Sequence, residues 1–68
     1  MTREQLKRAL KKAGLTQLDI AVKLGTSQQN FNNKVRRMSF SDAELSEIAE
    51  MLGARYVSCF EFSDGERI

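Results

Sequence analysis

Apolar residues along the first 52 positions recur at intervals of three and four, the spacing that brings side chains to one face of a helix. Four segments carry it, with apolar positions at Leu6, Ala9, Leu10 and Ala13; at Ile20, Ala21 and Leu24; at Phe31 and Val35; and at Leu45, Ile48, Ala49 and Leu52. The pattern predicts four helices, at about residues 2–14, 16–25, 27–37 and 42–52.

The start of each predicted helix carries a hydroxyl residue that can accept a hydrogen bond from an unpaired backbone N–H of the first turn. Three residues later comes a side chain that can return the bond, which is the sequence of a capping box. The pairs are Thr2 with Gln5, Thr16 with Asp19, Thr26 with Gln29, and Ser41 with Glu44. Gly14, Gly25 and Gly53 follow the first, second and fourth segments and predict where these helices end.

The period of the pattern changes from 3.6 to 2 after Gly53, where residues 55–62 are RYVSCFEF. A strand through this segment places Tyr56, Ser58, Phe60 and Phe62 on one face. The Asp-Gly pair at 64–65 then predicts a turn into a very short second strand. We therefore expect a mainly α fold, in which a four-helix domain at residues 1–53 is followed by a C-terminal β-hairpin at 54–68 that belongs to the same domain.

The second and third predicted helices are separated only by a tight turn at Gly25, which is the arrangement of a helix-turn-helix. The third helix buries little, because only Phe31 and Val35 share its apolar side. Another side carries Gln28, Gln29, Asn32, Asn33 and Arg36. Carboxamides present a donor and an acceptor in one plane, which matches the N6/N7 edge of adenine in a major groove wide enough for a helix. The composition of this helix therefore indicates a surface for DNA bases.

The composition of the whole chain fits a small globular domain, with 68 residues, 41% apolar and 29% charged. The formal charge of +2 hides an asymmetry: residues 1–37 have nine Lys/Arg against two Asp/Glu, a net +7, and residues 38–68 have two against seven, a net −5. The first half thus favours an anionic partner. Lys34, Arg36 and Arg37, with the lysines of the first helix, are candidates for phosphate contacts.

Several classes of protein fit the sequence poorly. The chain has no His and a single Cys, so we expect no disulfide, no Cys/His metal site and a reducing, cytoplasmic setting. Its longest apolar runs are two or three residues, so no membrane segment or signal peptide is expected. With no activated nucleophile and no phosphate-binding Gly loop, we expect neither an enzyme nor a cofactor or small-molecule substrate.

The segment LTQLDIAVKLGTSQQNFNNKVRR, residues 15–37, resembles the helix-turn-helix of lambdoid phage repressors and Cro proteins, the Xre family. The resemblance covers residues 2–53 and rests on Gln17, Ala21, Gly25 and Phe31. It implies a lambda-repressor-like fold in which the start of the second helix, Thr16 and Gln17, holds a DNA phosphate. It also implies that Ser27, Gln28 and Gln29 contact bases, with Asn32 and Asn33 one turn later. Lys34, Arg36 and Arg37 join Thr16 and Gln17 as expected DNA backbone contacts.

Two positions depart from the family pattern. Lys34 stands where the family usually buries an apolar residue, and no glycine is found near the end of the third helix. The fifth helix, which dimerises some members, is replaced by the strand segment. We therefore expect strands of two chains to pair, with Tyr56, Val57, Ser58, Cys59, Phe60 and Phe62 at the interface, and to set the two recognition helices about 34 Å apart on a palindromic site.

The expected function is that of a dimeric transcriptional regulator, a repressor that binds a specific double-stranded DNA sequence through the major groove. The alternative is a protein-interaction module, such as an antitoxin-like or inhibitor subunit, that keeps the helix-turn-helix shape, because a fold does not fix a function.

Overall fold

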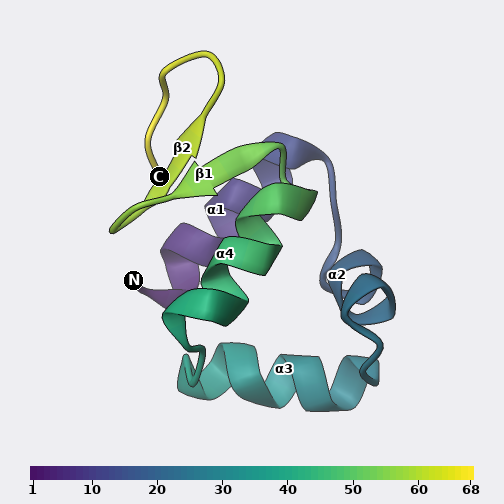
Figure 1. The fold of residues 1–68 in the computed structure, drawn as a ribbon. Coiled ribbons are helices and arrows are strands. Elements are labelled where there is room, and N and C mark those ends of the chain that lie inside the picture. The colour runs from purple at the N-terminus through teal and green to yellow at the C-terminus, as the bar shows by residue number, and fades with distance from the viewer.

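The computed structural model describes residues 1–68 and contains four helices followed by a two-stranded antiparallel hairpin. The elements are α1 (Arg3–Ala13), α2 (Gln17–Leu24), α3 (Gln28–Arg37), α4 (Asp42–Met51), β1 (Ala54–Tyr56) and β2 (Phe60–Phe62). In Figure 1, α3 runs along the lower edge of the molecule and the hairpin lies at the opposite end, with α4 between them. The predicted mainly α fold with a C-terminal hairpin is confirmed.

Three of the four predicted capping boxes form. In each, the hydroxyl of the residue before the helix accepts the backbone N–H three residues later, and the later side chain accepts the first residue's N–H in return. The pairs are Thr2 with Gln5, Thr16 with Asp19, and Ser41 with Glu44. The hydrogen bonds of the Thr16 backbone and side chain, in that order, lower the pKa of the Asp19 carboxyl.

The fourth capping prediction is wrong by one residue, because Ser27 and not Thr26 caps α3. The Ser27 hydroxyl accepts the backbone N–H of Asn30 at 3.1 Å. Thr26 belongs to the end of α2, where its own N–H donates to the Ala21 carbonyl at 3.0 Å and closes a Schellman motif together with Gly25. The end of one helix thus takes the residue that the sequence pattern assigned to the start of the next.

The end of α3 has the same geometry without a glycine. Met38 lies in the left-handed region with φ 50° and ψ 44°, and the N–H of Ser39 donates to the Lys34 carbonyl at 3.1 Å. A side chain in this region is strained by about 1–2 kcal/mol. Met38 is partly buried against the core, which offsets part of this cost.

The core is entirely apolar and is shared by the helices and the hairpin. Its buried side chains are Leu6, Ala9, Leu10, Ile20, Ala21, Phe31, Val35, Leu45, Ile48, Ala49, Leu52, Phe60, Phe62 and Ile68. Phe31 and Phe60 are the largest of the fully buried ones, and the Phe31 ring lies 5.7 Å from the ring of Phe40. Because Phe60, Phe62 and Ile68 complete this core, residues 54–68 are built into the same unit as the helices.

The hairpin differs from the expected one in the position of its first turn. The chain reverses at residues 57–59, so that Ala54 pairs with Phe62 and Tyr56 with Phe60. The alternation of apolar and polar residues does not reveal this turn, because Tyr56 and Phe60 face the core whether or not the chain reverses between them. Ser58 is the only residue of this turn that belongs to the usual turn formers, and there is no Gly, Pro, Asn or Asp at residues 57–59.

The predicted Asp-Gly turn does form, and it leads residues 66–68 back along the other edge of β2. Gly65, with φ 91°, donates its N–H to the Phe62 carbonyl at 2.9 Å. Phe60 and Ile68 then exchange two backbone hydrogen bonds of 2.9 Å each. Both edges of β2 are therefore paired, and the open edges are the outer edge of β1 and the outer edge of residues 66–68.

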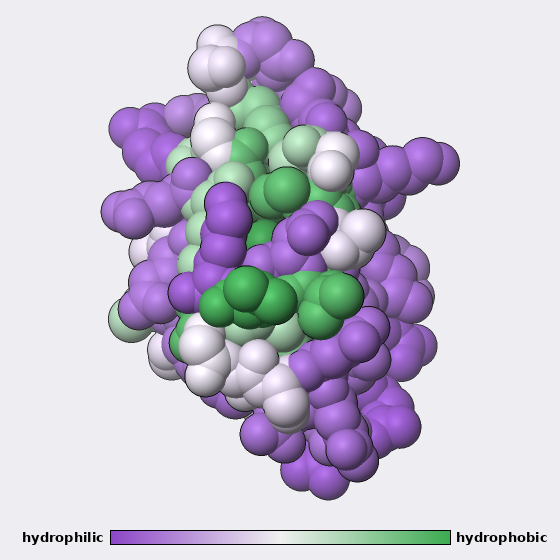
Figure 2. All heavy atoms as spheres, turned by 90° about the vertical axis from the view of Figure 1, so that its right-hand side faces the viewer, coloured by the Kyte–Doolittle hydropathy of each residue, from purple (hydrophilic) through white to green (hydrophobic).

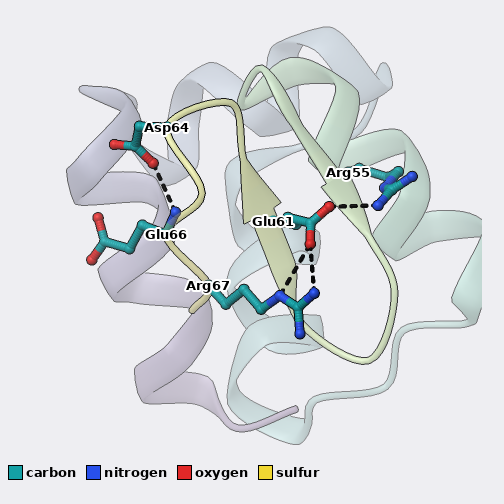
Figure 3. A network of polar contacts seen from close by, with 5 residues as sticks. All are labelled: Arg55, Glu61, Asp64, Glu66 and Arg67. Atoms are coloured by element: carbon teal, nitrogen blue, oxygen red, sulfur yellow. Dashed lines mark hydrogen bonds and ion pairs between the residues drawn. The ribbon is translucent and has the colours of Figure 1, made fainter.

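A network of charged side chains fastens this C-terminal segment. Figure 3 shows the Glu61 carboxylate between Arg55, at 2.5 Å, and Arg67, at 2.8 Å. These guanidinium groups, Arg55 first, lower the pKa of Glu61. Near the end of α1, Lys12 pairs with Asp64 at 2.9 Å and with Glu66 at 2.5 Å. The last turn is thus joined to the first helix.

None of the four helices has the length and apolar character that a membrane-spanning segment needs. No three His, Cys, Asp or Glu side chains lie together in a way that could hold a metal ion.

Candidate nucleic-acid interface

The turn between α2 and α3 consists of three residues and brings the two helices into contact. Gly25 has φ 72° and ψ 28°, a conformation that costs glycine little because it has no Cβ. Its N–H donates to the Val22 carbonyl at 3.1 Å. The geometry is the helix, tight turn and helix that the sequence predicts.

The position of α3 leaves most of its surface open. Phe31 is fully buried and Val35 is 3% exposed, while none of the other eight residues of the helix is buried. Figure 1 shows no other element below α3, and hydrophilic side chains fill the lower end of the molecule in Figure 2. The helix is therefore attached by one narrow apolar side and displays a broad polar one.

The residues predicted to contact bases lie together on or next to this polar side. Ser27, Gln28, Gln29 and Asn32 are exposed, and Asn33 is half-buried. Only two of these side chains have a partner within the chain. Ser27 caps the helix, and the Asn33 carbonyl oxygen accepts a hydrogen bond of 2.5 Å from the Arg36 guanidinium. The remaining three are free to bind a ligand.

A helix of 3.6 residues per turn places Asn33 directly opposite the side formed by Phe31 and Val35. Gln29 lies one turn before Asn33, and Arg36 and Arg37 follow about one turn later. We call these four residues the outer stripe of α3. A surface approached by α3 meets this stripe first.

Lys34 does not belong to the outer stripe, because its side chain points toward α4. Its ammonium group pairs with the Glu44 carboxylate and lies 5.8 Å from the centre of the Phe40 ring. The hydrogen bond from Lys34 is the main cause of the lowered pKa of Glu44. A DNA phosphate contact by Lys34, which the sequence suggests, requires this ion pair to open.

A hollow of about 270 Å³ lies beside this ion pair, between α3, α4 and the end of α2. It is lined by Leu24, Thr26, Phe31, Lys34, Glu44 and Glu47. Two carboxylates and one ammonium group surround an apolar floor, so its electrostatics do not favour an anion such as a DNA phosphate.

The other basic residues of the first half of the chain are largely unpaired. Of its nine Lys/Arg, only Lys12 and Lys34 take part in ion pairs. The exposed and unpaired ones are Arg3, Lys7, Arg8, Lys11, Lys23, Arg36 and Arg37. In the second half, Glu44, Glu61, Asp64 and Glu66 are paired, so four of seven acidic side chains have their charge compensated. The contrast in free charge between the two halves therefore persists in the fold, with the positive half the less compensated.

The two residues predicted to hold a phosphate lie at the start of α2. The Thr16 hydroxyl accepts the Asp19 N–H at 3.1 Å, and the Thr16 N–H donates to the Asp19 carboxylate at 2.9 Å. Gln17 is half-buried and begins the helix. The Thr16 hydroxyl hydrogen and the Gln17 amide remain available, although the Asp19 carboxylate places a negative charge close to them.

The residues predicted to form a dimer interface are divided by the fold. Phe60 is fully buried and Phe62 is 8% exposed, so their side chains belong to the core and cannot contact a second chain. This part of the interface prediction is corrected, because the aromatic face of the hairpin covers the helices. Tyr56 and Cys59 are half-buried, and only Val57 and Ser58, in the turn, are exposed.

One exposed feature was not singled out from the sequence. Leu18 is 47% exposed and Val22 is 69% exposed, four residues apart on α2. Figure 2 shows green side chains at mid-height on this side of the molecule, where α2 lies in Figure 1. The i, i+4 spacing of the two residues, offset from Ile20 and Ala21, is the signal that could have identified this apolar patch.

Comparisons of the chain with known protein families, curated proteins and solved structures find no match.

Proposed function

We propose that this protein is a transcriptional regulator, a dimeric repressor that binds a specific double-stranded DNA sequence with α3 in the major groove. The observation that carries the proposal is the polar side of α3. The buried side chains of this helix are Phe31 and Val35 alone, and it turns amides and guanidinium groups away from the core. The ten residues of α3 include five side-chain amides and no carboxylate.

The dimensions and chemistry of this side suit the major groove. The groove admits one α-helix, and amide side chains can form paired hydrogen bonds with the edge of adenine. Gln28 and Gln29 stand in the first turn of α3, are exposed and have no partner within the chain. In the proposal they contact base edges, with Asn32 one turn further along.

The unpaired basic residues supply attraction to the phosphates. Arg37 at the end of α3 and the four free Lys/Arg of α1 add positive charge that is not compensated within the fold. Thr16 and Gln17 contact a phosphate at the start of α2, where the helix dipole favours an anion. Such contacts position the protein and are insensitive to the base sequence.

The dimer in the proposal forms through the outer edge of β1. That edge has no backbone partner within the chain, and unpaired backbone groups at an edge favour pairing with another strand. A two-fold axis through such a pair relates two copies of α3, and a palindromic operator matches this symmetry. Sedimentation at micromolar concentration, with and without DNA, tests this step, and monomers under both conditions contradict it.

Selection of bound fragments from a random duplex pool is the direct test of the proposed function. We expect a palindromic consensus. On that consensus, Gln28→Ala and Gln29→Ala each cost roughly 1–3 kcal/mol of binding free energy and little on random DNA. Gln17→Ala weakens binding to all sequences alike. Ser46→Ala, at an exposed position of α4, serves as the matched control and leaves both affinities unchanged.

The competing function is that of a protein-interaction module, and the exposed patch of Leu18 and Val22 is the observation that favours it. The salt dependence of binding distinguishes the DNA-binding function from the protein-interaction function. Retention on heparin or bulk DNA that falls steeply between 50 and 200 mM salt, on the order of a thousandfold for six phosphate contacts, supports DNA binding. If the protein does not bind DNA even at low salt, the proposed DNA-binding function is wrong.

A further inference from the structure

Two side chains of the outer stripe are joined to each other. The Arg36 guanidinium donates a hydrogen bond through Nη2 to the Asn33 carbonyl oxygen Oδ1 at 2.5 Å. Neither side chain has another hydrogen bond or ion pair in the structure, so the guanidinium is held by Asn33 alone. Asn33 is half-buried although it points away from the core, as expected for a side chain covered by its neighbour.

The hydrogen bond brings the Arg36 guanidinium close to Asn33, the residue of α3 that points furthest from the core. At 100° per residue, Arg36 and Arg37 lie about 120° and 140° from the apolar side, on opposite flanks of the helix. Asn33 lies between these flanks at the point furthest from the core. Because the Arg36 guanidinium donates a hydrogen bond to Asn33, its end lies close to that residue, whereas the Arg37 side chain has no such contact.

The pairing changes what each residue can recognise. The carbonyl oxygen of Asn33 already accepts one hydrogen bond, so only its second lone pair is left for the paired contact with adenine. A guanidinium has five N–H donors in a rigid plane, and only one is used here. The others can form the two-pronged contact with O6 and N7 of guanine, which is the commonest specific contact of arginine in the major groove.

We propose that Arg36 recognises a guanine in each half of the DNA site and that Asn33 is a positioning residue that holds the guanidinium for this contact. The inference rests on the proposed function and deepens it, because it assigns one base to one residue. It also revises the role of Arg36 from a phosphate contact to a base contact, and the role of Asn33 from a base contact to a support.

The test compares fragments selected from a random duplex pool by the full chain and by two matched variants. Arg36→Lys keeps the charge but loses the planar fork, and Arg37→Lys makes the same change on the other flank. We expect the consensus of the full chain to contain a guanine that Arg36→Lys selects less strongly and that Arg37→Lys selects as strongly as the full chain does. Circular dichroism checks that the helix content of all three proteins is the same.

A second measurement tests whether the N7 atom of the guanine takes part in the contact with Arg36. Replacing that guanine by 7-deazaguanine removes the N7 acceptor, and we expect the affinity of the full chain to fall about ten- to a hundredfold. The same replacement has a smaller effect on Arg36→Lys, because an ammonium group lacks the planar fork. For Asn33, the expected result is a weaker preference for guanine over the other bases in Asn33→Ala and a preserved preference in Asn33→Asp, which keeps the acceptor for Arg36.

The outcomes separate the two proposals. A chain that selects no sequence from the pool overturns the proposed function and the assignment of Arg36 with it. A consensus that Arg36→Lys leaves unchanged, or a preference for guanine that Asn33→Ala leaves at full strength, overturns the corresponding assignment while the proposed function stands.

Discussion

Lys34 of α3 donates a hydrogen bond to the Glu44 carboxylate of α4, and the same ammonium group lies 5.8 Å from the centre of the Phe40 ring. The two side chains are ten residues apart in sequence and connect the helix that faces outward to the one behind it. Glu44 also accepts the backbone N–H of Ser41 at 3.0 Å, so one carboxylate serves both the capping box and the ion pair.

The stability contributed by Glu44 depends on pH in a direction that its environment determines. Lys34 first, and then the Ser41 backbone, lower the pKa of Glu44 below its ordinary value of 4.5. A carboxyl whose pKa is lowered by folding stabilises the folded state fully above 4.5 and loses that effect as the pH falls through its folded pKa. Because the pair is partly exposed, we expect at most about 1 kcal/mol.

Glu44→Gln tests this effect, since Gln keeps an oxygen for the Ser41 N–H and removes the charge. Urea unfolding should show the variant less stable than the parent at pH 7 and the difference shrinking below pH 4.5. Glu47→Gln, at a nearby carboxylate of α4 with no ion pair, is the control. A gap between parent and Glu44→Gln that stays constant down to pH 3 contradicts the assignment.

The capping of α3 by Ser27 makes a prediction that distinguishes it from its neighbour. Ser27→Ala removes the oxygen that accepts the Asn30 N–H, and we expect a loss of about 1 kcal/mol of unfolding free energy. Thr26→Ala leaves that bond intact and should cost clearly less. Paired denaturant titrations measure both, and the reverse order of the two losses would place the cap at Thr26.

The turn before α3 requires a left-handed residue at Gly25. A Cβ at this position meets no atom within 4 Å, so Gly25→Ala creates backbone strain without a steric clash. We expect a cost of about 1 kcal/mol for Ala and a smaller one for Asn, which tolerates this conformation better. Equal losses for the two variants, measured by thermal unfolding, contradict a purely conformational origin.

The hairpin is part of the core, so its disruption should unfold the helices as well. Phe60 is fully buried, and Phe60→Ala is expected to cost about 3–5 kcal/mol, most of the stability of so small a domain. Far-UV circular dichroism should show a large loss of helix at room temperature. Val57→Ala, in the exposed turn between the strands, is the control. A variant of Phe60 that keeps its helical signal and its melting temperature would show that the hairpin is only an appendage.

The patch on α2 distinguishes the two proposed functions. Leu18→Gln and Val22→Gln replace exposed side chains, so each should change the unfolding free energy by no more than about 0.5 kcal/mol. DNA affinity should be unaffected if α3 and the basic residues are responsible for binding. Fluorescence anisotropy with a labelled duplex measures this, and a loss of DNA binding in the double variant would place α2 at the interface.

Much of the fold could be predicted because its signals are local. A capping box joins residues three positions apart, and a buried stripe repeats every three or four positions, so Thr2, Thr16 and Ser41 could be recognised as helix starts from the sequence. The polar side of α3 was predictable for the same reason. Once Phe31 and Val35 are known to face inward, the helical repeat alone directs Gln29 and Asn33 outward.

The helical repeat by itself did not determine the rest. Whether Lys34 points to solvent or to Glu44 depends on where α4 lies. Thr26 and Ser27 are both able to cap a helix, and the structure shows that the Thr26 N–H bonds to the Ala21 carbonyl and that Ser27 caps α3. The period-two pattern could not predict the turn at 57–59. The chain reverses there and still keeps Tyr56 and Phe60 on the same face, so apolar and polar residues alternate as they would in one continuous strand. Spacing along a chain reports which face a residue belongs to, whereas only packing in three dimensions determines what that face meets.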